Sequence, residues 1–180
     1  MAQTDKKTLE GLNVYLIGFM GSGKTAAGRA LAKKLGVPFA DTDLLIRKLS
    51  GLGPAAFIKK RGLKSFRRAE RSVFRTAARS GGRVIALGGG LMPAGALRPL
   101  FKKSGITVYL ECGETVLFKR LKKNLSLRPL LGGGPEQARR AIKRLLKKRR
   151  PYYERADLTV NTSDLRPEKT AEKIKKLLKL

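Results

Sequence analysis

The chain has 180 residues, a length that fits one domain with a substantial buried core. A single cysteine and no histidine exclude an internal disulfide, a cysteine or histidine metal cluster, and a histidine general base. The formal net charge is +28, but no zinc finger, aromatic RNP-type strand or KH-type loop accompanies it. We therefore expect a solvated basic surface, and nucleic acid is not the expected partner.

The sequence shows neither a membrane-spanning segment nor a signal peptide. No apolar run approaches the ~20 residues that a membrane span needs. Residues 1–12 contain no apolar signal-peptide core, and we expect them to be a flexible lead-in to the first strand. These features predict a cytoplasmic protein without a membrane partner. A monomer is also expected, although no feature of the sequence reports the oligomeric state.

The first chemical motif is GFMGSGKT at residues 18–25. It follows the apolar run of residues 14–17 and precedes a helical pattern over residues 26–35, so G-x-x-x-x-G-K-[ST] has the strand, turn and helix context of a P-loop. The glycines let backbone N–H groups face one anion at the positive end of the helix. Lys24 then reaches the β- and γ-phosphates, and the Thr25 hydroxyl is a ligand for Mg²⁺. A glycine-rich turn that ends in Lys-Thr by coincidence is the weaker interpretation, because both flanks match.

Apolar runs and helical patterns alternate along the rest of the chain. Strands are expected over residues 37–40, 84–87, 106–110 and 158–160, and helices over residues 44–49, 54–61, 64–79, 93–102, 114–123, 136–150 and 168–180. Pro93 is expected to open its helix, Gly62 to separate two helices, and Pro151 to interrupt the helix before it. This alternation, without a repeat or a linker, predicts a single three-layer αβα sandwich around a five-stranded parallel sheet.

Residues 124–135 (NLSLRPLLGGGP) are rich in glycine and have few apolar residues to anchor them. Their three consecutive glycines can absorb backbone rotation, so this segment is the candidate for a mobile lid. Arg128 lies within it and can close over a transferring phosphate as an arginine finger.

Two aspartates follow the second predicted strand. In a parallel sheet, ligands bind beyond the carboxyl ends of the strands, so Asp41 and Asp43 are expected beside the P-loop. One carboxylate can accept the proton of an acceptor hydroxyl, and the other can hold the water shell of Mg²⁺. An isolated pair of this kind is more often a helix cap. The position beside a P-loop favours the catalytic interpretation.

Other polar and glycine positions are ambiguous when taken alone. Arg67 and Glu70 are spaced to pair on one helix face, although such pairs are usually solvated. The glycines at 88–90 allow a substrate to lie against the backbone, or they form a simple turn. Arg149 ends the basic run of residues 147–150, whose default interpretation is a solvated face. Spacing alone does not choose among these cations.

Six motifs in order resemble those of shikimate kinase, a member of the nucleoside monophosphate kinase-like P-loop group. They are GFMGSGKT, FADTD, FRRAE, ALGGG, RPLL and RRPYYERAD, and they span nearly the whole chain. The resemblance implies transfer of the γ-phosphate of ATP to the 3-hydroxyl of shikimate, with Mg²⁺ as the metal. It implies one kinase domain over residues 13–180, with a substrate-binding subdomain at about 42–80 and a lid at about 124–135.

The resemblance also implies roles for the residues of the acceptor site. Asp43 holds and deprotonates the acceptor hydroxyl. Arg67 and Arg149 grip the shikimate carboxylate, and Glu70 orients Arg67. The backbone of Gly89 contacts the ring hydroxyls.

On the donor side, the resemblance implies that Asp41 and Thr25 hold the Mg²⁺ and its water shell. Lys24 and Arg128 stabilise charge on the transferring phosphate, and Arg120 flanks the adenine. The implied nucleotide contacts are Gly21, Ser22, Gly23, Lys24, Thr25, Ala26, Arg120 and Arg128.

Arg47 and Leu63 stand where this family usually has acidic residues, which predicts fewer salt bridges between helices. Two other functions remain open. One is phosphorylation of another small molecule, such as gluconate or a nucleotide, and the other is polyanion binding by a shikimate kinase-like protein. The residues of FRxxE, GGG and the lid arginine favour shikimate over another small-molecule acceptor. The presence of every expected catalytic residue argues against a protein that only binds polyanions.

Overall fold

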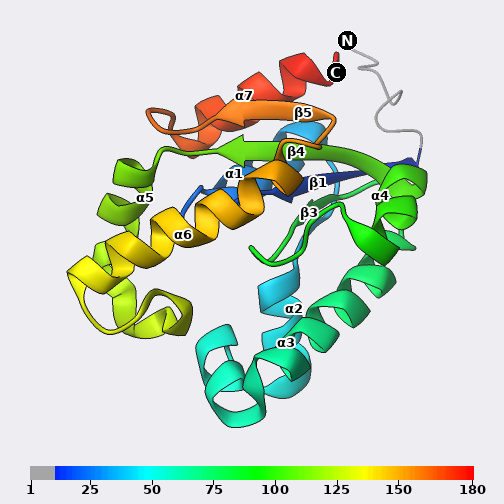
Figure 1. The fold of residues 1–180 in the computed structure, drawn as a ribbon. Coiled ribbons are helices and arrows are strands. Elements are labelled where there is room, and N and C mark those ends of the chain that lie inside the picture. The colour runs from blue at the N-terminus through cyan, green and yellow to red at the C-terminus, as the bar shows by residue number, and fades with distance from the viewer. Residues whose placement is uncertain (1–10) are drawn as a thin grey trace.

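The computed structural model describes residues 11–180, so most of the expected lead-in at residues 1–12 lies outside the described residues. Five parallel strands form one sheet in the order β2-β3-β1-β4-β5 (Figure 1). The strands are β1 (Asn13–Ile17), β2 (Phe39–Asp41), β3 (Val84–Ala86), β4 (Gly105–Glu111) and β5 (Leu158–Asn161). The helices are α1 (Lys24–Leu35), α2 (Thr42–Ser50), α3 (Pro54–Ala78), α4 (Arg98–Ser104), α5 (Glu114–Leu121), α6 (Pro135–Tyr153) and α7 (Pro167–Leu177), with 3₁₀ turns η2 (Gly95–Leu97), η3 (Lys122–Leu127) and η4 (Pro129–Leu131). Helices cover both faces of the sheet, which confirms the expected three-layer sandwich.

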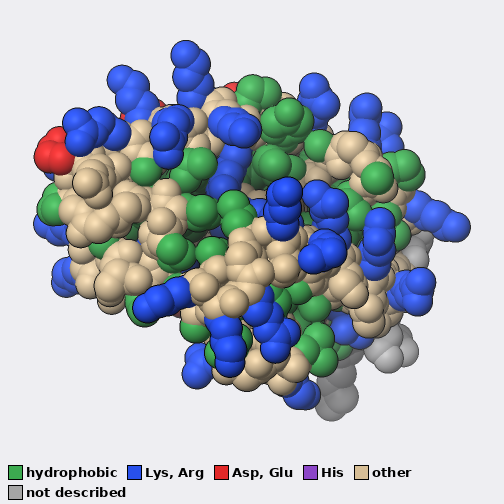
Figure 2. Space-filling view, turned by 60° about the horizontal axis from the view of Figure 1, so that its bottom comes forward, with side chains coloured by type: hydrophobic (Ala, Val, Ile, Leu, Met, Phe, Trp, Pro, Cys, Tyr) green, Lys and Arg blue, Asp and Glu red, His purple; other side chains and the backbone are tan. Residues whose placement is uncertain are grey.

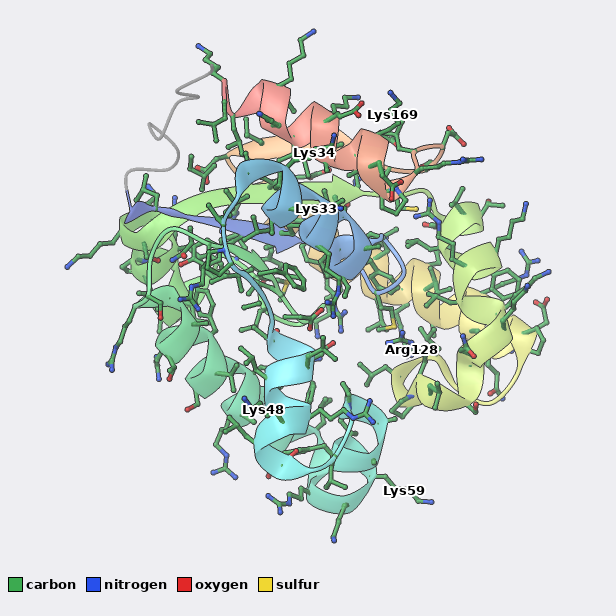
Figure 3. The ribbon with its side chains drawn as sticks, turned by 180° about the vertical axis from the view of Figure 1, so that it is seen from behind. Lys33, Lys34, Lys48, Lys59, Arg128 and Lys169 are labelled. Carbon is green, nitrogen blue, oxygen red and sulfur yellow. The ribbon has the colours of Figure 1, made fainter. Side chains whose placement is uncertain are left out.

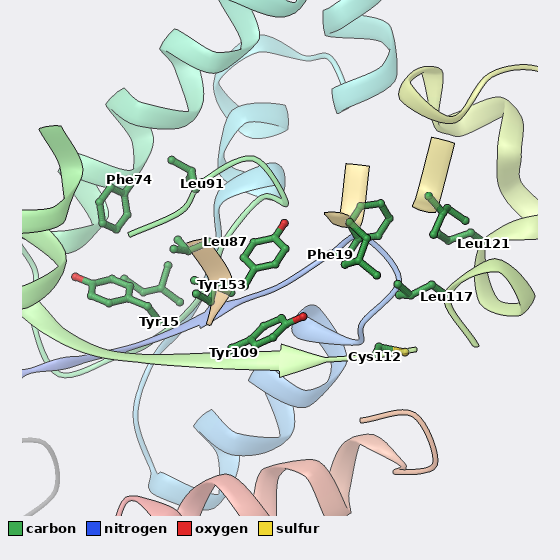
Figure 4. Close-up of a cluster of buried hydrophobic side chains, with 14 of the residues drawn as sticks. Tyr15, Phe19, Phe74, Leu87, Leu91, Tyr109, Cys112, Leu117, Leu121 and Tyr153 are labelled. Atoms are coloured by element: carbon green, nitrogen blue, oxygen red, sulfur yellow. The ribbon is translucent and has the colours of Figure 1, made fainter. Parts of the chain in front are cut away.

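The central strand β1 is buried along its whole length. Because side chains alternate along a strand, Tyr15 and Ile17 face one layer while Val14 and Leu16 face the other. Helices α1 and α7 pack on the side of Val14, and α3 to α6 pack on the side of Tyr15. Figure 4 shows this second side, where the ring of Tyr15 meets that of Phe74 edge to face at 5.4 Å between centroids. The loop that follows β1 is therefore attached to a fully buried central strand of the sheet.

Two prolines differ from their predicted roles. Pro151 lies inside α6, which continues to Tyr153, so the predicted interruption is wrong. Tyr153 is fully buried and stacks on Tyr109 at 5.2 Å between ring centroids, and this packing keeps the last turn helical. Pro93 does not open a helix, because the next residue is extended with a φ of −141°. Helix α4 instead has Pro99 in its first turn.

Helix α2 and the N-terminal part of α3 project away from the sheet (Figure 1), while the C-terminal part of α3 packs on it. Helix α3 bends at Gly62, whose φ of 79° and ψ of 158° are not helical, which confirms the predicted break. Ile46 and Phe57 belong to an apolar cluster that joins the two helices. Arg47 and Leu63 are both exposed, and within residues 11–180 no ion pair joins α2 to α3. Apolar packing is therefore what fixes α2 against α3.

The glycine-rich segment, residues 124–135, forms more turns and apolar contacts than its composition predicts. Turns η3 and η4 occupy much of it, and its side chains reach the core at two points. Leu131 is fully buried, and Leu125 packs against the same apolar cluster as Tyr15. Leu127 between them is 61% exposed. Apolar contacts thus hold parts of the segment, whereas we expected few.

The surface is strongly basic. Figure 2 shows a face on which many Lys and Arg side chains are distributed among apolar and other groups, with very few acidic ones. Between residues 11 and 110 the acidic residues are Asp41, Asp43 and Glu70, and each is at least partly buried. None of the helices within residues 11–180 combines the length and the apolar content that crossing a membrane requires.

Candidate active site

The loop between β1 and α1 is shaped by glycines with positive φ. Gly18 has a φ of 141°, and a Cβ added there would lie 2.7 Å from the carbonyl oxygen of Leu110. Gly23 has a φ of 95° and directly precedes the first turn of α1. Lys24 is buried, and its Nζ donates hydrogen bonds to the carbonyl oxygens of Gly18 at 2.9 Å and Phe19 at 2.8 Å. This is the geometry of a P-loop, with the ammonium group held across the loop.

Asp41 connects the P-loop to α2. Its Oδ1 accepts hydrogen bonds from the backbone N–H groups of Asp43 at 2.9 Å and Leu44 at 3.3 Å. Its Oδ2 accepts a hydrogen bond from the Thr25 hydroxyl at 2.7 Å. The helix-cap interpretation is therefore correct, and the same carboxylate also lies next to the predicted metal-binding hydroxyl. Carboxylate and hydroxyl oxygens are the donors that Mg²⁺ prefers, so the pair fits this ion.

Asp43 lies in the first turn of α2 and faces the loop after β3. Its Oδ1 is buried and has no hydrogen-bond partner within residues 11–180. Burial raises the pKa of Asp43, and the neighbouring Asp41 raises it further, while Lys24 opposes the shift. Burial also lowers the pKa of Lys24 to about 8, against the attraction of Asp43 and Asp41. A carboxylate with a raised pKa is a better proton acceptor than an exposed aspartate.

The glycines after β3 make room for charged side chains. Arg67 and Glu70 form an ion pair on α3, and Glu70 is only 1% exposed. Burial raises the pKa of Glu70, and the charge of Arg67 opposes this shift. A Cβ at Gly88 would overlap with Glu70, and a Cβ at Gly90 would overlap with the guanidinium of Arg67. The sequence left open whether these glycines admit a substrate or form a simple turn. The structure shows that Gly88 and Gly90 make room for protein side chains.

Arg149 and Tyr153 hold the middle glycine from the other side. Nη1 of Arg149 donates a hydrogen bond to the carbonyl oxygen of Gly89 at 2.9 Å, and the Tyr153 hydroxyl donates to the same oxygen at 2.7 Å. Arg149 is only 7% exposed, whereas Lys148 and Arg150 beside it are exposed. The solvated-face interpretation is therefore wrong for Arg149. Tyr153 was not predicted, although it lies in the quoted motif RRPYYERAD.

Two cavities share a boundary at this edge of the sheet. One, the P-loop cavity, is lined by Gly21, Gly23, Lys24, Thr25, Ala26 and Asp41. The other, the arginine cavity, is lined by Arg67, Glu70, Arg149 and apolar residues of α3 and the glycine-rich segment. Met20, Asp43, Gly89 and Arg128 line both. Asp43, whose pKa is raised, and the cation Arg128 therefore lie at the boundary between the two cavities.

Three of the predicted residues lie in less obvious places. The Nε of Arg128 is buried and has no hydrogen-bond partner within residues 11–180, and Figure 3 shows the residue on the glycine-rich segment. Ser22 is 1% exposed and lies behind the loop, where its carbonyl oxygen accepts a hydrogen bond from Thr162 at 3.0 Å. Arg120 donates hydrogen bonds to the carbonyl oxygens of Gly21 at 3.2 Å and Thr162 at 2.8 Å. Arg120 thus ties the P-loop to the loop after β5.

Met20, Leu127 and Leu130 also line the arginine cavity and were not predicted. They supply apolar walls opposite the charged groups. Met20 and Leu130 lie in the quoted motifs GFMGSGKT and RPLL, whereas no pattern in the sequence distinguishes Leu127 from other apolar residues.

The parallel sheet, the P-loop and the two joined cavities define a P-loop kinase of the nucleoside monophosphate kinase-like type. The family model described as Shikimate kinase matches residues 20–179. The chain belongs to the shikimate kinase family.

Individual relatives agree with this assignment. A shikimate kinase of Thermodesulfovibrio yellowstonii is 42% identical over 162 residues, which covers 90% of this chain and 92% of the relative. A shikimate kinase of Rhizobium meliloti is 37% identical over 174 residues, covering 97% of this chain and 89% of the relative. The structure of shikimate kinase from Acinetobacter baumannii in complex with shikimate is 33% identical, with a TM-score of 0.89 and 96% of each chain covered.

Proposed function

We propose that this enzyme transfers the γ-phosphate of ATP to the 3-hydroxyl of shikimate, giving shikimate 3-phosphate and ADP. The observation that carries the proposal is that Asp43 and Arg128 line both the P-loop cavity and the arginine cavity. A kinase needs this arrangement, since donor phosphate and acceptor hydroxyl must meet in line beside a base and a cation. The family assignment and the relative solved with shikimate support shikimate as the acceptor.

The acceptor is held through its carboxylate. Arg67 and Arg149 present guanidinium groups to the arginine cavity, and planar guanidinium groups match a carboxylate through paired hydrogen bonds. The ion pair with Glu70 fixes Arg67, and the hydrogen bond to Gly89 fixes Arg149. Neither side chain has to be ordered when the substrate arrives, so less conformational entropy is lost on binding.

The acceptor hydroxyl is oriented by Asp43. Its Oδ1 is the buried atom without a partner, so it is available to accept the hydroxyl proton as the new O–P bond forms. The oxygen–hydrogen bond breaks toward Asp43 while the bond between the γ-phosphorus and the bridging oxygen of ATP breaks toward ADP. The raised pKa of Asp43 makes this carboxylate a stronger base than an exposed one.

The donor phosphates are held by the loop and by cations. Gly21, Gly23, Lys24, Thr25 and Ala26 line the P-loop cavity, and Arg128 borders it from the glycine-rich segment. Their backbone N–H groups and the ammonium of Lys24 would bind the phosphates. Thr25 and Asp41 would hold Mg²⁺, which neutralises phosphate charge when bound. Arg120 is proposed to flank the adenine, since it binds the carbonyl oxygen of Thr162 beside the P-loop.

Larger-scale features follow from the same proposal. We assign substrate binding to residues 42–80, which include α2 and α3, and lid closure to residues 124–135. The turn residues of the lid place Arg128 at the boundary of both cavities, so a lid movement carries this cation with it. We propose that the enzyme acts as a monomer in the cytoplasm, where ATP is abundant.

A coupled assay of ADP release tests the proposed function. The full chain is incubated with ATP and Mg²⁺ and with shikimate, gluconate or a nucleoside monophosphate as the acceptor. Of the three acceptors, we expect only shikimate to give ADP release above background. Shikimate 3-phosphate should form in an amount equal to the ADP released. Turnover with another acceptor and none with shikimate would overturn the substrate assignment, and no turnover with any of them would overturn the kinase assignment.

A further inference from the structure

A third hollow lies outside the proposed active site. It is a groove of about 620 Å³ between α2, α3 and the edge strand β2, and we call it the edge groove. It shares no lining residue with the arginine cavity and only Asp41 with the P-loop cavity. Its volume lies within the range of small-molecule sites. Phosphoryl transfer uses none of its other residues.

Much of the wall of the edge groove is apolar. Two large side chains of α2 are unusually open to solvent, since Leu44 is 43% exposed and Leu49 is 78% exposed. The apolar lining residues are Phe39, Ala40, Leu44, Leu45, Leu49, Val73 and Ala77. An apolar ligand seated here would remove both exposed leucine side chains from water, which is the main driving force for binding at such a surface.

Three cations border these apolar residues. They are Arg29 from α1, Lys48 from α2 (Figure 3) and Arg83 immediately before β3. None of them forms an ion pair within residues 11–180. The Nε of Arg83 is buried and has no hydrogen-bond partner within the same residues. The guanidinium of Arg29 lies 5.2 Å from the ring centroid of Phe39, which holds it at the rim.

Asp41 is the acidic residue that lines the groove, and it does not neutralise these cations. Its Oδ1 accepts from the N–H groups of Asp43 and Leu44, its Oδ2 accepts from Thr25, and the residue is only 8% exposed. The carboxylate is thus already hydrogen-bonded on both oxygens. The free charge that faces the groove is positive.

We propose that the edge groove binds a small amphipathic anion, with one carboxylate or sulfonate group on a flat or branched apolar body. The anionic group pairs with Arg83 and Lys48, and the apolar body covers Leu44, Leu49 and Val73. A nucleotide or a sugar phosphate does not match this surface, because its body is polar and would lose hydrogen bonds to water against leucine side chains. A second copy of the chain is a different occupant, and it predicts a dimer formed through this face.

Isothermal titration of the full chain with 2-naphthoate tests the proposal, with the neutral 2-naphthalenemethanol as the matched ligand. A ligand of about 13 non-hydrogen atoms should bind with a Kd near 1 mM or below. We expect one equivalent of 2-naphthoate to bind, and the alcohol to bind about tenfold more weakly, because its neutral hydroxyl can form neither an ion pair nor a paired two-oxygen contact with a guanidinium. No binding at 10 mM ligand, or equal binding of acid and alcohol, would overturn the proposal.

Variants locate the bound probe. We expect Arg83→Gln to weaken 2-naphthoate about tenfold and to leave the alcohol unchanged. Lys173→Gln on α7 makes the same change of charge outside the groove and should alter neither ligand. Thr76→Phe fills the groove and should abolish both, and thermal unfolding shows whether this variant is folded. If Thr76→Phe does not fold, the comparison of Arg83→Gln with Lys173→Gln decides the question alone.

Two results would place the probe elsewhere or assign another occupant. Loss of 2-naphthoate binding in Arg67→Lys, with Arg83→Gln unaffected, would place it in the arginine cavity and overturn the proposal. A dimer in sedimentation velocity that dissociates in Leu49→Asp would show that a second copy covers the groove, and would also overturn it.

Discussion

The P-loop and the arginine cavity lie side by side, yet the chain builds them in different ways. In the P-loop, Lys24 binds carbonyl oxygens only five and six residues away. In the arginine cavity, Arg149 and Tyr153 reach Gly89 across 60 and 64 residues, and the N–H of Gly88 reaches Thr42 across 46. The loop that holds Lys24 is therefore closed by local contacts, with Arg120 and Thr162 bracing it from 99 and 140 residues away. The acceptor site instead depends throughout on α2, α3, the loop after β3, the glycine-rich segment and α6 packing correctly. Substitutions in the arginine cavity should therefore weaken use of the acceptor more than binding of the nucleotide.

Asp43 belongs to both cavities, so its replacement should have the largest effect. We expect Asp43→Asn to lower kcat by about 10² to 10⁴, because the amide cannot accept the hydroxyl proton. The dissociation constant of ATP, measured by titration calorimetry, should change by less than about threefold, since the P-loop contacts remain. Turnover close to that of the wild type would remove Asp43 as the proton acceptor.

A small change in the glycine triplet should damage only the acceptor side. Gly90→Ala places a methyl group on the guanidinium of Arg67, so this side chain must leave its ion pair with Glu70. We expect kcat/KM for shikimate to fall by about 10², with KM for ATP nearly unchanged. Gly113→Ala is the control, because Gly113 has a φ of −65° and its nearest neighbour to an added Cβ is 3.8 Å away. Equal losses for ATP and shikimate would show that the two sites are not built independently.

Arg67→Lys tests the same site without adding bulk. The lysine keeps the charge but loses the paired hydrogen bonds to the carboxylate, so KM for shikimate should rise about 10- to 100-fold. KM for ATP should change by less than about threefold. Arg71→Lys, one turn further along α3 on an exposed position, should have no effect on either. If Arg67→Lys weakened ATP and shikimate equally, Arg67 would not be a carboxylate-binding residue.

The dependence of kcat/KM for ATP on pH tests the role of Lys24 in the P-loop. The pKa of Lys24 in the ligand-free enzyme is lowered from 10.5 to about 8 by burial. Because kcat/KM reports the free enzyme, kcat/KM for ATP should fall above pH 8 and be about tenfold lower at pH 9. Lys24→Arg keeps its charge at these pH values and should lose this alkaline decrease, whatever its absolute activity. An unchanged alkaline limb in Lys24→Arg would assign the titration to another group.

The contrast between local and distant contacts also explains which features the sequence could predict. The motif GFMGSGKT contains the residues that form the P-loop, so the position of the loop and the placement of Lys24 in it could be predicted without the fold. Asp43 and Arg128 were identified, but that they border both cavities depends on how α2 and the glycine-rich segment pack. The buried state of Arg149 contradicted the solvated appearance of its basic run. Pro151 misled the helix prediction, because the packing of Tyr153 outweighs the cost of a proline in the last turn.

Tyr153→Phe should have the smallest effect and tests the longest-range contact of the acceptor site. The change removes one of the two hydrogen bonds to the carbonyl oxygen of Gly89 and leaves that of Arg149 in place. The loss of one such hydrogen bond costs about 1 kcal/mol. We therefore expect kcat/KM for shikimate to fall about fivefold at most, and the free energy of unfolding to fall by about 1 kcal/mol. Tyr152→Phe, whose parent side chain is 37% exposed, is the matched control and should change neither. A large loss of ATP binding in Tyr153→Phe would mean that Gly89 positions the donor as well as the acceptor, because Gly89 lines both cavities.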